Sequence, residues 1–260
     1  MKKQLKDYAN SVTSQFGEDG ILTRMLEILS IKHGECVEFG AWDGKTYSNT
    51  YNLIKNCGWE GALIEGCSAR FKELENTYSE RKDLALINRY VGLKENNNLD
   101  SILSSTGISR EFDLLSIDID GNDYHVWHDL THYRPKIVVI EFNPTIPNGI
   151  FFVQDRDPAV NQGNSLLALQ RLGSKKNYEL VCCTDINAVF VQEALFPLFG
   201  IENNSLESLH KDAQYETQLY QLYDGTIKIS GCKQLLWHGV EIKEEELQIL
   251  PEAQRVYPGS

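Results

Sequence analysis

Short apolar segments alternate along this chain with segments that have the spacing of amphipathic helices. The apolar runs are short and are followed by Gly, Asn or acidic residues, as buried parallel strands are: 35–40, 61–65, 84–87, 112–118 and 135–142. The intervening segments place apolar residues three or four positions apart, as at Ile21, Met25 and Leu29. Strands that alternate with helices are joined by crossover connections, so this order predicts a parallel sheet covered on both faces.

The last two apolar runs differ from the others because a tight polar turn joins them. Residues 178–183 and 188–191 flank the turn at Asp185–Asn187, and two such strands around a short polar turn form a hairpin. We therefore expect the sheet to finish with one antiparallel strand. The predicted fold class is α/β and Rossmann-like, with a mostly parallel seven-stranded sheet.

The domain organisation follows from length and from where the alternation stops. With 260 residues, the chain can form one large domain with a small extension. We expect a domain over 1–200 and an accessory segment over 201–260 that packs on it, with a polar helix over 205–223. Residues 144–164 carry several prolines and glycines, and loops of this length are usually functional, so we expect a lid over the substrate.

Charge and cysteine content narrow the partners and the compartment. The formal net charge is −12, and so acidic a surface repels nucleic-acid phosphates and anionic lipids. A small substrate or another protein fits better, and nucleic acid is not expected. The six cysteines contain no CxxC spacing, which is typical of reduced thiols in a cytosolic protein. The chain shows no secretory signal and no membrane span, so we expect it in the cytoplasm.

The residues after the first two strands have the character of a nucleotide-like ligand site. Gly40 and Gly44 allow a tight turn and a close approach of the backbone to a ligand. Glu38 can orient backbone groups or the amino end of a ligand. Glu65, at the end of the next strand, can accept hydrogen bonds from ribose hydroxyls. A dinucleotide site prefers glycine where Trp42 stands, which counts against NAD.

These residues carry a resemblance to a known family. The segment 38–44 with Glu65 resembles motifs I and II of class I S-adenosylmethionine (SAM)-dependent methyltransferases. The segment 115–123 is similar to the Ile-Asp-Val-Glu-Gly element of FkbM-type enzymes, although Asp120 stands where that family has Glu. The chain also looks like bacterial methyltransferases found with capsule and surface-polysaccharide genes. The resemblance implies the class I methyltransferase fold, SAM as cofactor, and O-methylation of a sugar or nucleotide-activated sugar.

The N-terminal segment also resembles that family. The order Ser14 to Asp19 is similar to an element that closes over SAM, which implies that Gln15 contacts the cofactor. The alternative is a helix N-terminus whose acidic residues interact favourably with the helix dipole.

Acidic residues are placed at the ends of the two later strands. Asp118 and Asp120 follow one strand and Glu141 ends its neighbour. Open α/β sheets bind ligands at these ends, so Asp118 is expected at the cofactor. Clustered carboxylate oxygens there suit Mg²⁺ or Mn²⁺, so the three residues are candidate metal ligands. In the alternative, Asp118 bonds loop amides while Asp120 and Asp123 cap the next helix.

Methyl transfer to a hydroxyl needs alignment of the reactants and removal of one proton. Asp120 and His125 are the candidate bases, because both should lie close to the strand ends. In the lid, Arg156 is placed to pair with a substrate phosphate or carboxylate. Asn164 and Ser165 are expected to cap the helix that follows and to face the substrate.

Other functions remain open at the level of the sequence. The acceptor could be a phosphate or phosphoramidate oxygen or another small metabolite. The chain could also be a non-catalytic Rossmann-like binding subunit, although the intact set of Glu38, Gly40, Gly44 and Glu65 argues against it. The C-terminal sixty residues could shape the acceptor pocket or form a homodimer contact.

Overall fold

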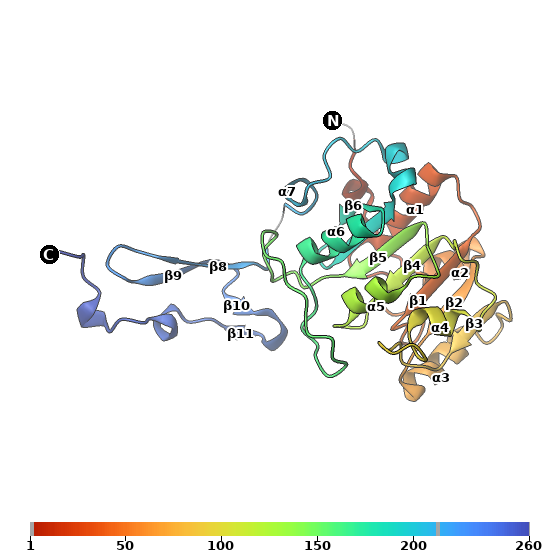
Figure 1. Ribbon diagram of the computed structural model, residues 1–260, viewed down its shortest axis with the longest axis horizontal. Coiled ribbons are helices and arrows are strands. Elements are labelled where there is room, and N and C mark those ends of the chain that lie inside the picture. Colours follow the sequence, from red (N-terminus) through yellow and green to blue (C-terminus); the bar gives the residue numbers. More distant parts are fainter. Residues whose placement is uncertain (1–2, 212–213, 260) are drawn as a thin grey trace. The chain divides into compact units, whose positions relative to one another are not determined.

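A seven-stranded sheet organises the computed structural model, which describes residues 3–211 and 214–259. Its strand order is β3-β2-β1-β4-β5-β7-β6 (Figure 1). The strands are β1 Glu35–Phe39, β2 Glu60–Ile64, β3 Leu84–Ile87, β4 Leu114–Ile117, β5 Ile137–Glu141, β6 Tyr178–Cys183 and β7 Asn187–Gln192. The first five strands pair in parallel, and β7 runs antiparallel to both β5 and β6. This confirms the predicted α/β sheet with one antiparallel strand.

Helices cover both faces of the sheet (Figure 1). They are α1 Glu18–Leu29, α2 Tyr51–Cys57, α3 Ser68–Thr77, α4 Leu99–Leu103, α5 Asp123–Asp129 and α6 Leu166–Lys175. Successive side chains of a strand point to opposite faces, and the core is accordingly divided in two. Val37 packs with α4, α5 and α6 around the buried Trp127, and Cys36 packs with α1, α2 and α3 around the buried Trp59.

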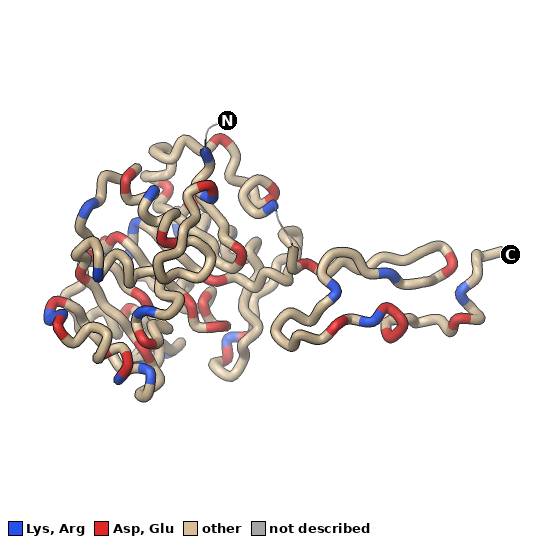
Figure 2. Tube along the Cα trace, turned by 180° about the vertical axis from the view of Figure 1, so that it is seen from behind, with Lys and Arg blue, Asp and Glu red and all other residues tan. Residues whose placement is uncertain are grey.

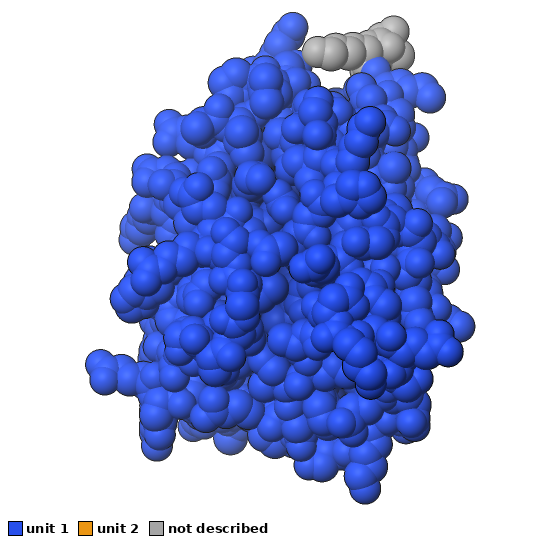
Figure 3. Space-filling view, turned by 90° about the vertical axis from the view of Figure 1, so that its right-hand side faces the viewer, with its two compact units in different colours: residues 1–143, 148–210 blue, residues 144–147, 211–260 orange. Residues whose placement is uncertain are grey.

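The described chain forms two compact units. The larger, blue in Figure 3, comprises 1–143 and 148–210, and the smaller comprises 144–147 and 211–260. The larger unit thus ends at His210, ten residues beyond the boundary expected from the sequence. It includes α7 Leu206–Leu209, whose Leu206 is buried in the core. The predicted packing of 201–260 on the domain stays a prediction.

The smaller unit consists of two short hairpins. They pair β8 Thr217–Gln221 with β9 Ile227–Gly231, and β10 Gln234–Leu235 with β11 Val240–Glu241. The polar helix expected over 205–223 is therefore wrong, apart from α7; residues 212 and 213 lie outside the described part. The physical reason is that residues 217–223 are rich in Thr, Leu and Tyr, and Thr and Tyr favour strands.

Charge is distributed over both units. Asp and Glu number 37 against 25 Lys and Arg, and Figure 2 shows both signs along the whole chain trace. Among the described residues, no helix has both the length and the apolar character that crossing a lipid bilayer requires.

Candidate active site

The turn after β1 lies directly against the chain that leaves β4. Gly40 has a φ of +74°, and a Cβ on it would lie 1.9 Å from the carbonyl oxygen of Asp118. Gly44 also has a positive φ, and the Tyr78 hydroxyl donates to its carbonyl at 2.8 Å. Any side chain at residue 40 would push the two strand ends apart. Gly40 therefore sets the spacing between the loops where a ligand would lie.

Glu38 is buried beneath this turn and organises the loop before α2. Its carboxylate accepts hydrogen bonds from the hydroxyls of Ser48 at 2.6 Å and Thr50 at 2.7 Å, and from the amide of Asn49 at 2.9 Å. Burial raises the pKa of Glu38, and these hydrogen bonds act in the opposite direction. Of the two roles expected for Glu38, the orientation of backbone groups is the one that the structure shows.

The Ser48–Thr50 segment was missed as part of the site. Ser48 and Thr50 donate to Glu38, and the Asn49 side chain donates to the Ser116 hydroxyl of β4 at 3.1 Å. The three side chains therefore connect β1 to β4 below the strand ends. In the sequence, a Ser-Asn-Thr run before a helix looks like an ordinary N-terminal cap. Only its contact with the buried Glu38 marks it as part of the site, and the sequence does not show that contact.

Glu65 follows β2 and ties two loops together. One carboxylate oxygen accepts from the amide of Trp42 at 2.9 Å, and the other accepts from the amide of Cys67 at 2.6 Å. Glu65 thus fixes the glycine turn to the start of α3. Each carboxylate oxygen has a second lone pair, so the same group can still accept hydrogen bonds from a ligand.

The N-terminal segment is held beside the glycine turn. Asp19, buried in the first turn of α1, accepts from the amides of residues 12–14 at 2.8–2.9 Å. Ser14 forms a parallel bridge with Tyr47. Gln15 is exposed next to that bridge. The segment therefore lies near the loop 44–48. The Asp19 carboxylate binds the amides of the segment itself, which accounts for an acidic residue at this position.

The three candidate metal ligands come together. Asp118, Asp120 and Glu141 each offer an oxygen, and these oxygens lie within 4.8 Å of one another. Parallel pairing of β4 with β5 puts their carboxyl ends at the same edge of the sheet. Burial, followed by repulsion from neighbouring carboxylates, raises the pKa of Asp118 to about 8 and that of Glu141 to about 10. Protonation of these groups or a bound cation would relieve this repulsion.

Asp123 holds the loop that carries this cluster. Its fully buried carboxylate accepts from the amides of Ile119 and Gly121, both at 2.9 Å. Asp120, between them, is exposed and has a φ of +58°. Of the alternatives left open by the sequence, Asp123 bonds the loop amides, whereas Asp118 and Asp120 remain in the carboxylate cluster.

His125 lies on α5 and faces the long loop. Its Nε2 is 2.9 Å from the carbonyl oxygen of Gln154. Because a carbonyl only accepts, Nε2 carries the proton in this contact and Nδ1 is the ring's acceptor. His125 therefore fastens α5 to the expected lid and does not belong to the carboxylate cluster.

The loop 148–164 is tied to the β4–α5 loop by buried amides. Asn164 is fully buried, and its side chain donates to the Gly121 carbonyl at 3.1 Å. The Gln154 side chain accepts from the amides of Gln162 and Gly163, both at 2.9 Å. Asn164 therefore acts here on the position of the loop rather than on a ligand at the surface.

Arg156 extends from the same loop across to α5. Its guanidinium forms an ion pair with Asp129 and donates to the carbonyl of Leu93 at 3.0 Å. The guanidinium is still partly exposed, with its side chain 43% accessible. A substrate phosphate would therefore have to share or displace Asp129 in order to bind Arg156.

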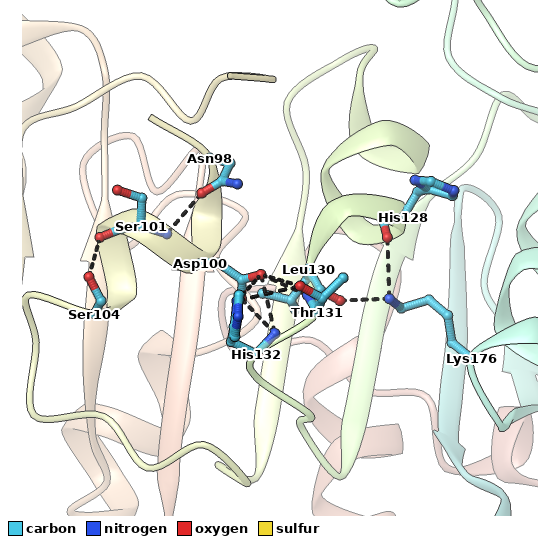
Figure 4. Close-up of polar contacts among 9 residues, drawn as sticks. All are labelled: Asn98, Asp100, Ser101, Ser104, His128, Leu130, Thr131, His132 and Lys176. Atoms are coloured by element: carbon cyan, nitrogen blue, oxygen red, sulfur yellow. Dashed lines mark hydrogen bonds and ion pairs between the residues drawn. The ribbon is translucent and has the colours of Figure 1, made fainter. Parts of the chain in front are cut away.

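A second polar cluster fixes α4 and α6 to the connection after α5 (Figure 4). Asp100 accepts from the amide of Thr131 at 2.8 Å and from that of His132 at 3.0 Å. Lys176 donates to the carbonyl of Leu130 at 2.7 Å. Thr131 and His132 precede β5, whereas Glu141 ends it, so this cluster lies toward the amino end of that strand. We interpret it as a structural bracket.

Comparison with known proteins agrees with this geometry. Residues 93–173 match the family model described as "Methyltransferase FkbM domain", a span that contains Asp118, Asp120 and Glu141. No curated protein matches the chain. The matched span covers β4, β5 and the loop that carries the carboxylate cluster.

Several solved structures show a distant likeness. The N-terminal domain of EvdMO1, crystallised in the presence of SAH and D-fucose, is 12% identical, with a TM-score of 0.45 over 67% of this chain and 82% of that one. The putative methyltransferase yhhF from Escherichia coli is 13% identical, with a TM-score of 0.42 over 72% and 90%. A SAM-dependent methyltransferase from Clostridium acetobutylicum is 11% identical, with a TM-score of 0.43 over 67% and 90%.

Because these TM-scores are low, the fold is assigned from the sheet order of this chain itself. That order, with β7 alone antiparallel, is the one expected for the class I methyltransferase fold. The chain thus combines a Rossmann-like sheet with a span, residues 93–173, that is similar to a methyltransferase domain.

Proposed function

We propose that this chain transfers a methyl group from SAM to a hydroxyl of a sugar or nucleotide-activated sugar. The observation that carries the proposal is the cluster of Asp118, Asp120 and Glu141 at the strand edge where Gly40 approaches β4. A hydroxyl placed at that edge would meet both a methyl donor held by the β1 and β2 loops and oxygen groups that can take its proton.

The residues around the glycine turn would hold SAM. Gly40 allows the turn after β1 to approach the chain that leaves β4, and Glu65 keeps free lone pairs for ribose hydroxyls. Asp118 after β4 and Gln15 in the N-terminal segment are the further candidate contacts of SAM. The negative charges of Glu18 and Glu38 act on Asp118. A site with this negative charge favours the cationic sulfonium and ammonium groups of SAM. When bound, SAM supplies an electrophilic methyl group on its sulfonium.

A divalent cation fits the carboxylate cluster. Asp118, Asp120 and Glu141 provide the oxygen ligands that Mg²⁺ and Mn²⁺ prefer. A cation would also neutralise the repulsion that raises the pKa values of Asp118 and Glu141. When bound, it would orient acceptor hydroxyls and lower their pKa.

The hydroxyl proton has to leave as its oxygen bonds to the methyl carbon and the carbon–sulfur bond breaks. Asp120 is the exposed member of the cluster and the candidate base. His125 remains a second candidate through Nδ1, because Nε2 is engaged with Gln154. Asp123 acts as a positioning residue, since it holds the loop that presents Asp120.

The acceptor class is supported by the family resemblance and by the charge of the site. A sugar presents adjacent neutral hydroxyls, which a cation-loaded carboxylate cluster can bind together. A phosphate or phosphoramidate oxygen does not present such a pair of neutral hydroxyls. Arg156 and Asn164 lie on the loop 148–164, where Arg156 could meet the phosphates of an activated sugar by exchanging its contact with Asp129.

We further propose that the reaction belongs to capsular or surface-polysaccharide assembly in the cytoplasm. This context comes from the resemblance to FkbM-type enzymes. The absence of disulfides supports a reducing compartment, because all six cysteines are unpaired.

The test is transfer of labelled methyl from SAM to a panel of sugar nucleotides and free sugars, with Mg²⁺ or with EDTA. Asp120→Asn and Glu141→Gln should lose turnover by on the order of a hundredfold or more. Glu75→Gln, an exposed change of equal charge on α3, is the matched control. SAM binding without transfer to any sugar would favour a non-sugar acceptor, and no SAM binding would favour a non-catalytic binding subunit.

A further inference from the structure

The outer edge of β9 is closed by side chains of its own unit. The amide of Ile227 donates to Oε1 of Gln248 at 2.9 Å, and Nε2 of Gln248 donates back to the carbonyl of Ile227 at 2.8 Å. The amide of Ile229 donates to Glu244 at 3.2 Å. These backbone groups therefore point away from β8, and the hairpin cannot accept another strand on the β9 side.

The outer edge of β8 is open. Leu219 pairs with Ile229, and Gln221 pairs with Ile227. The backbone groups of Ile229 and Ile227 point away from β8, so those of Leu219 and Gln221 point away from β9. Thr217, two residues earlier, has the same orientation. Within residues 3–211 and 214–259, the amides and carbonyls of Thr217, Leu219 and Gln221 have no recorded hydrogen bond. This leaves a row of backbone donors and acceptors at the surface.

Nothing in the sequence of β8 protects that edge. Residues 217–223 read Thr-Gln-Leu-Tyr-Gln-Leu-Tyr and contain no charge, proline or glycine. Natural proteins guard exposed strand edges with such residues, because an open edge is a template for another strand. Leu219 is 59% exposed on this strand.

The smaller unit also exposes a large apolar surface. Its exposed large side chains, each 37–88% accessible, are Leu219, Tyr220, Leu222, Tyr223, Leu235, Trp237, Val240, Ile249, Leu250, Val256 and Tyr257. With about 150–250 Å² for a whole large side chain, their exposed parts amount to on the order of 1,000 Å². A stable protein interface buries about 800 Å² on each partner. The unit thus has enough apolar surface for a dimer contact.

We infer that β8 pairs antiparallel with the β8 strand of a second copy of this chain. The three outward-facing residues are evenly spaced about Leu219, so a twofold axis there sets Leu219 opposite the partner's Leu219. Thr217 then lies opposite the partner's Gln221. A twofold contact must be self-complementary, and an uncharged strand with this symmetry meets that condition without repulsion. The result is a continuous β9-β8-β8-β9 sheet, independent of the proposed acceptor.

The test is the oligomeric state of the full chain by sedimentation over a wide concentration range. We expect wild type to be a dimer that dissociates on dilution. Leu219→Lys sets two like charges face to face and should weaken association by more than about tenfold. Ser230→Lys makes the same charge change on β9 and is the matched control, which should stay dimeric. Both variants should keep the circular dichroism spectrum and the melting behaviour of wild type, which shows that they are folded.

A cross-link makes the register testable. In an antiparallel pair, directly opposed residues have Cα atoms about 4.5–5.5 Å apart, which is within reach of a disulfide. Leu219→Cys should therefore give a covalent dimer on oxidation, and Ser230→Cys and wild type should not.

Hydrogen exchange distinguishes a β8 edge covered by a second copy from one covered by the same chain and from one left uncovered. We expect the Leu219 amide to be protected at high concentration and to exchange rapidly on dilution. A monomer with that amide protected at all concentrations would show that the larger unit of the same chain covers β8, and a monomer with rapid exchange would show an uncovered edge. A dimer unaffected by Leu219→Lys would place the contact elsewhere. Each of these results overturns the inference.

Discussion

At the scale of single residues, the carboxylates of this site divide into two kinds. Glu38, Glu65 and Asp123 accept hydrogen bonds from backbone amides and hold loops in place. Asp118 and Glu141 instead face other carboxylates, and burial, followed by this repulsion, raises their pKa values. The first kind shapes the space for ligands, and the second kind supplies the negative charge that a cation or a proton must balance.

Removing Glu65 should weaken the binding of SAM. Glu65→Ala leaves the amides of Trp42 and Cys67 without their buried acceptor, and each loss costs about 1–3 kcal/mol. The dissociation constant for SAM should rise by about tenfold or more in calorimetry. Glu75→Ala on the exposed side of α3 is the control. Unchanged affinity in folded Glu65→Ala would remove Glu65 from the cofactor site.

Gly40 should be far less tolerant of a side chain than another glycine of similar backbone. Gly40 and Gly58 both have positive φ, but only at Gly40 would a Cβ collide, 1.9 Å from the Asp118 carbonyl. Gly58→Ala should cost about 1 kcal/mol of stability for its conformation alone. Gly40→Ala should cost more than that and should also lose SAM binding. Equal unfolding midpoints for the two variants would contradict the close approach of β1 to β4.

The carboxylate cluster should make the metal-free protein less stable at high pH. The pKa values of Asp118 and Glu141 are raised in the folded chain, to about 8 and about 10, above the unfolded value of about 4. Their contribution is therefore full below about pH 4 and is lost as pH rises through the folded values. In EDTA, the melting temperature should fall between about pH 5 and pH 9.

The variant Glu141→Gln removes one of these titrating groups and should melt higher than wild type at about pH 9. Mg²⁺ should raise the melting temperature of wild type at that pH and have little effect on Glu141→Gln. Glu75→Gln should behave as wild type in both experiments. Stability that does not depend on pH or on residue 141 would show that the charges of the cluster do not repel one another in solution.

At the scale of elements, the connection between α4, α5 and β5 depends on one buried acid. Asp100 is 8% exposed and accepts from the amides of Thr131 and His132. Asp100→Ala should lower the free energy of unfolding by about 1–3 kcal/mol, because those amides lose their acceptor. Since this bracket lies toward the amino end of β5, the affinity for SAM should stay unchanged. A stable variant with weaker SAM binding would instead place Asp100 in the site.

The order of elements could be predicted from the sequence because periodicity changes clearly between strands and helices. The runs 112–118 and 135–142 indicated β4 and β5, and the hairpin turn at 185–187 indicated the antiparallel strand. The smaller unit could not be predicted in the same way. Residues 217–223 mix polar residues with Leu and Tyr without a clear alternation. An isolated hairpin has no buried face that would require apolar residues at every second position.

The site could be predicted in part, for a similar reason. Acidic residues at strand ends are visible in the sequence, and Asp118, Asp120 and Glu141 do come together. The engagement of Arg156 with Asp129 and of His125 with Gln154 depends on how the loop 148–164 folds back. A loop without periodicity carries no signal for such contacts.

At the scale of the whole molecule, the sheet order brings the chemistry to one edge. Parallel pairing of β2, β1, β4 and β5 sets their carboxyl ends side by side, so residues from 40 to 141 share one site. The smaller unit adds a strand edge and an apolar surface that the chemistry does not use. The proposed methyl transfer involves residues of the larger unit, and the proposed self-association involves β8 of the smaller unit.

The most direct measurement of the central claim is the binding of SAM and of S-adenosylhomocysteine to the full chain by calorimetry, followed by methyl transfer to sugar nucleotides in the same buffer. We predict binding in the micromolar range that Glu65→Ala weakens, and transfer that Asp120→Asn and Glu141→Gln abolish while Glu75→Gln retains it. A folded wild-type chain that binds neither SAM nor its product would contradict the account.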